Sequence, residues 1–374
     1  MKKTTLIPLV IFLTACTFAI PAQKVSAGNN TRDIKVLISE SSSPVSVKTS
    51  GAIVIKDLDT FKKYSVTQAG TFKVSASKKQ VQAGSVKSKK GLEIFLKNKK
   101  DTFTINGNTY NGELLIKPAE KTQIIEVLPI EEYLYGVLPY EMSYSWPIEA
   151  LKAQAVAART YTLKSIENTQ ETNFDLYSDV RSQMYKGSAK VYDSVKKAVD
   201  ETKGQVLKYK DNLFYTYYHA NCGGHTDAPP WLTSAVKPLH GSKCGYCNHG
   251  AGAKWKHTLS KETINNFLKK NKIAGTIKSV SVASKLSSGR AKDLKIKTTK
   301  TTKVIPCNTF RVGVGSTKFK SCFITSISGL TFSGKGYGHG GGLCQEGAKG
   351  MAEAGKDYKD ILNRYYPGAK LENI

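Results

Sequence analysis

Acidic residues are scarce in this sequence of 374 residues, which contains 29 aspartates and glutamates against 56 lysines and arginines. The formal charge of +27 predicts a polyanionic partner, and composition alone leaves nucleic acid, anionic lipid and acidic wall polymer open. A general bias toward lysine would explain the same excess without such a partner. The hydrophobic content of 40% excludes a disordered chain, and the length is sufficient for one large domain or two ordinary ones.

Long apolar stretches are missing after the first 30 residues, so no membrane-spanning segment is expected there. The N-terminus itself has Lys2 and Lys3, then an apolar run, then the small residues 25–27, which predicts a signal peptide over residues 1–27. Export to the cell envelope, either the periplasm or the cell-wall space, argues against nucleic acid as the partner. The alternative is a lipoprotein, because the tetrapeptide LTAC would make Cys16 a lipid anchor.

A nucleotide-binding loop is also missing. The segment GYGHGGGLCQEGA has five glycines between Gly336 and Gly342, but no Gly-Lys-Ser/Thr follows them. Such dense glycine predicts backbone that lies close to something flat, which is either a glycan or another strand.

Short β-prone runs, separated by Gly, Asn, Lys and Ser, fill most of the first third of the chain. We therefore expect an α+β fold that is β-rich, with a β-rich N-terminal part over residues 28–126 and a second part over residues 127–374.

The pattern becomes helical at IEEYLYGVLPYEM. Tyr133, Leu134 and Val137 share one helical face, and we expect Pro139 to end this helix. A second helix is predicted from Pro147, with five residues at helical spacing. These residues are Ile148, Leu151, Ala155, Ala158 and Thr162. Several alanines in between leave room for a close neighbour, so most of this helix is expected in the core.

Further along, residues 194–203 are a short helix candidate, and GQVLKYK and LFYTYYHAN are predicted strands. The segment DYKDILNRYYPGAKL predicts a last short helix that ends at Pro367-Gly368.

Six ordered motifs, spread from Ile34 to the C-terminus, resemble the SpoIID/LytB family of bacterial cell-wall proteins. They are EEYLYGVLPYEM, EALKAQAVAARTY, SQMYKG, YYHANCGGHT, GYGHGGGLCQEGAKGMAEAG and ILNRYYPGA. The resemblance implies a peptidoglycan lytic transglycosylase that acts on glycan strands stripped of peptides, with Glu141 of the P-x-E-M element as its catalytic acid. It also implies that residues 127–374 are the catalytic part, with a short helical catalytic segment and motifs that converge on one glycan-binding groove. LytB-like members are instead modifiers of wall amidases, so a non-catalytic protein that works with a wall amidase is the alternative.

Glu141 also has the setting of a proton donor. A carboxylate among apolar and aromatic groups has a raised pKa, which keeps a proton available near neutral pH. Hydrolytic glycosidases usually need two carboxylates, and the other candidates, Asp179, Asp227 and Glu346, are as well explained by structural roles. A single acid suits a transglycosylase, in which the O6 hydroxyl of the sugar replaces water. A muramidase, in which water attacks, remains a second alternative.

Several residues near these motifs are predicted to contact the glycan. They are Tyr140, Arg159, Tyr218, His219, Asn221, His339 and Gln345. For Arg159 a role in holding the Glu141 segment is the alternative, and for the YYHAN residues it is a strand end with a tight turn.

The seven cysteines divide into three groups. Cys16 lies in the signal segment, and Cys307 and Cys322 flank a segment that can turn back on itself, which predicts a disulfide in an oxidising compartment. The remaining four could form a structural zinc site or two disulfides. They are Cys222, Cys244, Cys247 and Cys344, and His219, His225 or His249 could replace one thiol as a zinc ligand.

Overall fold

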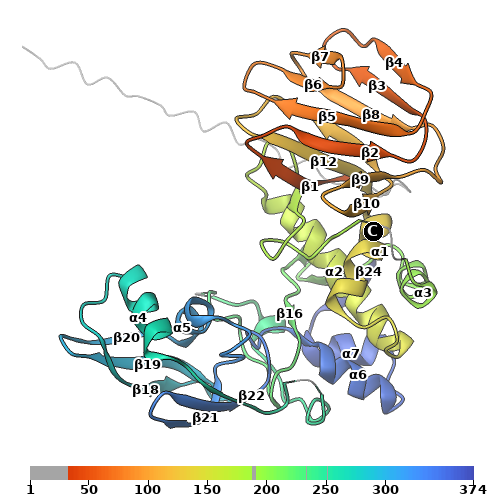
Figure 1. Cartoon of the computed structure of the whole chain (residues 1–374). Coiled ribbons are helices and arrows are strands. Elements are labelled where there is room, and N and C mark those ends of the chain that lie inside the picture. Colours follow the sequence, from red (N-terminus) through yellow and green to blue (C-terminus); the bar gives the residue numbers. More distant parts are fainter. Residues whose placement is uncertain (1–32, 188–190, 233, 251) are drawn as a thin grey trace, which may run out of the picture. The chain divides into compact units, whose positions relative to one another are not determined.

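The computed structural model describes residues 33–187, 191–232, 234–250 and 252–374 (Figure 1). The predicted signal peptide and the alternative lipid anchor at Cys16 lie outside these residues. No helix in the described part of the chain is both long and apolar enough to span a bilayer.

The N-terminal part is built from two β-sheets. The sheet orders are β13-β1-β12-β11-β8-β3-β4 and β10-β9-β2-β5-β6-β7. Their strands are β1 (Asp33–Ser41), β2 (Val45–Thr49), β3 (Ile53–Asp57), β4 (Lys63–Val66), β5 (Gly70–Ala76), β6 (Val81–Ala83), β7 (Val86–Ser88), β8 (Leu92–Leu96), β9 (Phe103–Ile105), β10 (Asn108–Tyr110), β11 (Glu113–Ile116), β12 (Thr122–Pro129) and β13 (Leu176–Tyr177). In β2, buried Val45, Val47 and Thr49 alternate with exposed residues, as a half-buried strand requires. Both sheets contribute to one apolar core, which confirms the β-rich prediction.

The first helix, α1 (Ile130–Glu141), corrects the prediction that Pro139 ends it. Pro139 lies in the last turn, where few hydrogen bonds remain to be lost, and the backbone N–H of Met142 still donates to the Leu138 carbonyl at 2.8 Å. Glu141 is therefore the last residue of a helix, not part of a loop.

The second helix, α2 (Ile148–Asn168), is the centre of the helical region. It begins directly after Pro147 and contacts four other helices, which confirms its predicted core position. These are α1, α3 (Asp193–Glu201), α6 (Gln345–Glu353) and α7 (Tyr358–Tyr365). Its alanines at 150, 153, 155, 157 and 158 have no exposed surface, so the neighbours approach closely.

Short strands connect the motifs around α2. They are β14 (Gln205–Tyr209), β15 (Asn212–Leu213), β16 (Tyr218–His219), β23 (Leu343–Cys344) and β24 (Lys370–Asn373), with a 3₁₀ turn at Lys237–Leu239. The segment LFYTYYHAN is only partly paired, since residues 214–217 between β15 and β16 belong to no strand. Strand β16 pairs in parallel with β23, so that Tyr218 lies opposite Leu343 and His219 opposite Cys344. This pairing brings two distant motifs side by side.

A further segment has its own apolar core. It contains β17 (Trp255–Thr258), α4 (Lys261–Lys270), β18 (Ile277–Lys285), β19 (Ala291–Thr298), β20 (Thr302–Pro306), α5 (Cys307–Val314), β21 (Phe323–Ser328) and β22 (Thr331–Lys335). We call residues 254–335 the basic segment. Cys307 and Cys322 form a disulfide within it, with their Cα atoms 6.0 Å apart.

Candidate functional site

Glu141 is mostly buried but keeps part of its surface exposed. Burial raises the pKa of its carboxyl group above the ordinary value, against hydrogen bonds from the Met184 backbone N–H and the Tyr218 phenol. The Met184 N–H lies 3.4 Å from Oε1. The C-terminal end of a helix carries partial negative charge, which further disfavours a carboxylate there. The raised pKa favours the protonated form of this carboxyl group, and the two hydrogen bonds hold it in a defined position.

Gln183 fixes the Tyr218 phenol. Its Nε2 donates to the Tyr218 hydroxyl at 3.0 Å, and its Oε1 accepts from the hydroxyls of Tyr133 at 3.2 Å and Thr162 at 2.7 Å. Gln183 is buried, so these bonds form in a low-dielectric setting where they hold position strongly. Sequence reasoning assigned no role to Gln183, although its motif SQMYKG carried part of the family resemblance.

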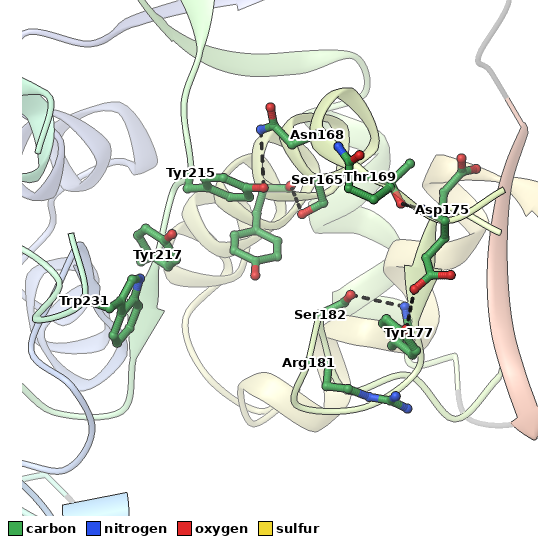
Figure 2. Close-up of a pocket in the computed structure, with 13 residues that line it drawn as sticks. Ser165, Asn168, Thr169, Asp175, Tyr177, Arg181, Ser182, Tyr215, Tyr217 and Trp231 are labelled. Carbon is green, nitrogen blue, oxygen red and sulfur yellow. Dashed lines mark hydrogen bonds between the residues drawn. The ribbon is translucent and has the colours of Figure 1, made fainter. Parts of the chain in front are cut away.

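An open cavity of about 490 Å³ has Tyr161 in its lining, together with the residues labelled in Figure 2. Tyr161 lies between this cavity and the Glu141 site. The Tyr161 ring is 6.4 Å from the ring of Tyr218, the partner of Glu141, and 5.9 Å from the ring of Tyr217 in the cavity lining. The Tyr217 ring in turn meets Tyr215 at 5.6 Å and Trp231 at 5.2 Å. Figure 2 shows Trp231, Tyr217 and Tyr215 following one another along the cavity. Such aromatic faces suit the apolar faces of sugar rings.

Polar groups complete the lining of this cavity. They come from Ser165, Asn168, Thr169, Gln170, Glu171, Asp175, Arg181 and Ser182. Asn168 donates to the Tyr215 hydroxyl at 3.3 Å, and the Arg181 guanidinium lies over the Tyr177 ring at 3.6 Å while it pairs with Asp179 at 2.7 Å. The cavity therefore offers both stacking surfaces and hydrogen-bonding groups.

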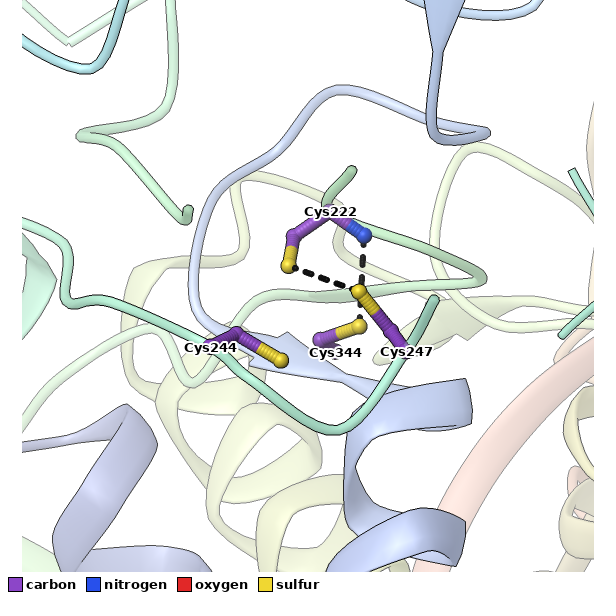
Figure 3. Close-up of side chains that lie close together, drawn as sticks. All are labelled: Cys222, Cys244, Cys247 and Cys344. Carbon is purple, nitrogen blue, oxygen red and sulfur yellow. Dashed lines mark hydrogen bonds between the residues drawn. The ribbon is translucent and has the colours of Figure 1, made fainter. Parts of the chain in front are cut away.

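Four cysteines converge at a second point near these motifs (Figure 3). Cys222, Cys244, Cys247 and Cys344 are all buried, none is in a disulfide, and their Sγ atoms lie within 4.8 Å of one another. The Sγ atoms of Cys222 and Cys247 are 3.5 Å apart. Zn–S bonds of about 2.3 Å in a tetrahedron place sulfurs roughly 3.8 Å apart. The four thiols could therefore hold a metal ion with little movement.

Hydrogen-bond donors also point at these sulfurs. The backbone N–H groups of Cys222 and Gly347 lie 3.2 and 3.3 Å from Cys344 Sγ, and the Tyr365 hydroxyl lies 3.1 Å from Cys244 Sγ. Such donors stabilise thiolates, which are the form that binds a soft divalent ion. Among the described residues, neither His219 nor His225 has a ring nitrogen that joins this cluster of ligand atoms. His249 is likewise no member of the cluster of described ligand atoms.

Two predicted glycan contacts are corrected by their burial. Arg159 has no exposed surface: it pairs with Glu131 at 2.6 Å and donates to the carbonyls of Gln205 and Val199. It ties α1, α2 and β14 together and cannot reach a glycan. Asn221 is equally buried, and its Nδ2 donates to the Cys247 carbonyl at 3.0 Å. It positions the cysteine loop.

His219 and His339 lie beside each other, with ring centroids 5.3 Å apart. Burial lowers the pKa of His339 to about 3, so its ring is neutral, with Nε2 donating to the Tyr218 carbonyl and Nδ1 accepting from the Gly341 N–H, each at 3.0 Å. Its ring lies 5.0 Å from Trp231, which places it next to the cavity. The buried His219 bonds the Gly341 carbonyl.

The remaining predicted contacts differ in access. Gln345 is buried and its Nε2 donates to Gln154 at 3.4 Å, whereas Tyr140 is 40% exposed beside Glu141. The glycine-rich loop packs against protein, because a side chain at Gly342 would collide with the Tyr217 carbonyl and one at Gly338 with His219. The sequence predicted either a glycan or another strand beside this loop, and the structure shows another segment of the chain there.

The chain was compared with known proteins. The model of the Stage II sporulation protein family (SpoIID) matches residues 119–209, and that of a domain of unknown function (DUF8618) matches residues 246–342. An uncharacterized protein of Brachyspira hyodysenteriae is 37% identical over 72% of this chain and 74% of its own length. The stage II sporulation protein D of Bacillus subtilis is 28% identical over 67% of this chain and 76% of its own length.

The amidase enhancer of Bacillus subtilis is 34% identical over 64% of this chain, a match that spans 40% of that longer protein. These matches place the chain among proteins that are named for sporulation or for amidase enhancement. The chain belongs to the SpoIID/LytB family, which confirms the resemblance seen in its motifs.

Proposed function

We propose that this protein is a peptidoglycan lytic transglycosylase that cleaves the bond between MurNAc and GlcNAc, with Glu141 as acid and then base. The observation that carries the proposal is the setting of Glu141. Burial raises the pKa of its carboxyl group, which accepts hydrogen bonds from Tyr218 and Met184 and remains partly exposed. The Tyr218 ring lies 6.4 Å from that of Tyr161, which lines an aromatic cavity.

The reaction needs one proton donor and no water. Glu141 protonates the glycosidic oxygen as the bond from C1 of MurNAc breaks, and GlcNAc leaves with its hydroxyl restored. The Glu141 carboxylate then takes the proton from the O6 hydroxyl of the same MurNAc, whose oxygen attacks C1. The product is a 1,6-anhydro end, and Glu141 is again protonated. The Tyr218 phenol stabilises the carboxylate between the two steps.

The substrate that fits is a glycan strand without stem peptides. The cavity beyond Tyr161 supplies stacking rings for the sugars that flank the scissile bond, and its polar groups suit their hydroxyls and acetamides. The predicted contacts that fit this role are Tyr140, which is 40% exposed, and His339, whose ring lies 5.0 Å from that of Trp231 at the cavity.

A zinc ion held by Cys222, Cys244, Cys247 and Cys344 is part of the proposal. With four protein ligands the ion would have no open position for water, so it would cross-link the loop at residues 244–247 to β23 and stabilise the fold. Elemental analysis of unreduced protein tests this point. One zinc ion per chain is expected. Protein that contains no zinc and has two disulfides among these four cysteines would be the contrary result.

The proposed location is the cell envelope, after removal of residues 1–27, with lipid anchoring at Cys16 as the alternative route of attachment. The division of the chain between residues 126 and 127 remains a prediction.

The direct test is product analysis. Purified glycan strands stripped of peptides are digested, and the products are examined by mass spectrometry, with the Glu141→Gln variant as the blank. Ends of 1,6-anhydro-MurNAc are expected. Reducing MurNAc ends would instead establish a muramidase, and intact strands would reject cleavage altogether.

The second candidate is a non-catalytic enhancer of a wall amidase, favoured by the 34% identity to the amidase enhancer. It predicts that the protein raises the rate of a wall amidase on intact peptidoglycan and that Glu141→Gln leaves this stimulation unchanged.

A further inference from the structure

Positive charge is concentrated in the basic segment. Residues 254–335 contain 18 lysines and arginines but only two acidic residues, Glu262 and Asp293. The segment thus supplies an excess of 16 positive charges out of the +27 of the whole chain. It coincides with most of the domain of unknown function, and the proposed chemistry at Glu141 gives it no role.

The charge has an ordered position on the three-stranded sheet β18-β19-β20 (Figure 1). In the central strand β19, exposed Lys295 and Lys297 alternate with buried Leu294 and Ile296, and Lys292 is exposed at its start. Alternate residues of a strand lie about 7 Å apart on one face. The outer face of β19 therefore carries Lys295 and Lys297 side by side, with Asp293 next in the same row, while Lys292 alternates with this row.

Register places small polar groups on both sides of this row. Lys297 lies between Ser279 of β18 and Thr302 of β20, and Lys295 lies between Ser281 and Val304. The serines and the threonine are exposed. Hydroxyls beside ammonium groups are suitable donors to phosphate oxygens.

The lysines of this segment lack acidic partners within the structure. Among the described residues of the basic segment, the only ion pair is that of Arg290 with Asp227. Asp293 accepts a hydrogen bond from Ser284 at 2.6 Å. By contrast, Lys56, Lys90 and Lys121 of the N-terminal sheets each pair with a carboxylate. The charge on the basic segment is thus uncompensated and available to an external anion.

The chemistry of the face selects one polyanion. Proteins that bind single-stranded nucleic acid use aromatic rings to stack bases between their basic residues. The outer-face positions given by the register carry Ser, Lys, Thr, Val, Asp and Pro, with no aromatic residue among them. A flexible chain of phosphodiesters without bases fits such a face.

We propose that the outer face of the β18-β19-β20 sheet binds an anionic phosphodiester polymer of the teichoic type, and so anchors the protein in the cell wall. This binding is independent of the reaction at Glu141. Its strength depends on salt, because each lysine that contacts a phosphate releases a counterion.

The test compares two variants that lose equal charge. The first is Lys295→Gln and Lys297→Gln on β19. The matched control is Lys48→Gln and Lys87→Gln, which are exposed residues of β2 and β7 in the N-terminal sheets. The probe is lipid-free poly(glycerol phosphate), and its Kd is measured at several salt concentrations. Oligo-thymidylate with the same number of phosphates is the comparison ligand.

The β19 variant is expected to raise the Kd for poly(glycerol phosphate) about tenfold and to make its dependence on salt shallower by about two counterions, while the control changes the Kd about twofold or less. Equal loss in both variants would overturn the proposed face, since net charge alone would explain the binding. Equal or tighter binding of oligo-thymidylate by the unaltered protein would overturn the proposed polymer. The Glu141→Gln variant should bind poly(glycerol phosphate) like the unaltered protein, so that failure of the proposed cleavage leaves this result readable.

Discussion

Two glutamates, Glu126 on β12 and Glu141 at the end of α1, have closely similar hydrogen-bond partners. Glu126 accepts hydrogen bonds from the Tyr185 hydroxyl at 2.7 Å and the Gly112 backbone N–H at 2.9 Å. Glu141 has a tyrosine hydroxyl and a backbone N–H as well. Burial raises the pKa of both, that of Glu126 to about 7.

The difference between them is access. Glu126 has no exposed surface and lies within the protein interior, so its proton can serve only the fold. Glu141 keeps an exposed part, and its partner Tyr218 lies 6.4 Å, ring to ring, from Tyr161 in the lining of an open cavity. A raised pKa therefore does not by itself mark a catalytic acid, because a structural carboxyl group shows the same shift. The site is recognised by the raised pKa together with the space in which a substrate can lie.

The largest expected difference between the two glutamates is in the effects of Glu141→Gln and Glu126→Gln on the cleavage rate. Glutamine keeps the shape of the side chain but has no proton to give. We expect Glu141→Gln to lower the rate of glycan cleavage by about 10²–10⁴, the usual contribution of a general acid, and Glu126→Gln to leave it within about twofold. Rates on stripped glycan strands give the measurement. A catalytic loss in Glu126→Gln with intact folding would erase the distinction.

The next test uses the pH dependence of stability. Because the pKa of Glu126 is raised on folding from 4.5 to about 7, the folded state binds a proton that the unfolded state releases in this interval. Stability should therefore fall as the pH rises from 4.5 to 7, by on the order of 3 kcal/mol from this group. Urea unfolding at a series of pH values should show this decline in the parent protein and a smaller one in Glu126→Gln. Equal slopes would show that Glu126 is ionised in the fold.

Substitution of the tyrosines that donate to these glutamates, Tyr218 and Tyr185, should distinguish the two sites by a smaller effect. Tyr218→Phe removes a hydrogen bond that lowers the pKa of Glu141, so cleavage should slow about tenfold and its alkaline limb should move to higher pH. Tyr185→Phe should keep the cleavage rate and instead reduce the free energy of unfolding by about 1–3 kcal/mol, because Glu126 loses a buried partner. A pH–rate profile of both variants separates these outcomes. An unmoved profile in Tyr218→Phe would mean that its phenol does not act on Glu141.

The sequence predicted those features that depend on local pattern. The small-residue core of α2, the β-rich first third and the aromatic setting of Glu141 all follow from neighbours within a few positions. The functions of Arg159 and Asn221 did not, because their partners Glu131 and Cys247 are 28 and 26 residues away and burial by tertiary contacts decides their role. Gln183 was missed for the same reason, since its partners lie on α1, α2 and β16. The strands β4, β6, β7 and β10 have only three or four residues, too few for a readable alternation.

The smallest expected effect concerns the cavity that distinguishes Glu141 from Glu126. Trp231 lies at its edge, 47% exposed, with its ring against Tyr217 and His339. If sugars stack there, Trp231→Ala should raise KM for long glycan strands about fivefold, or roughly 1 kcal/mol, with little change in kcat, and Trp231→Phe should restore most of it. Strands shorter than the distance from Glu141 to Trp231 should show no difference, because they do not reach this ring. An equal effect on short and long strands would mean that the substitution acts through the fold, and the open cavity would then no longer distinguish Glu141, the proposed catalytic acid, from Glu126.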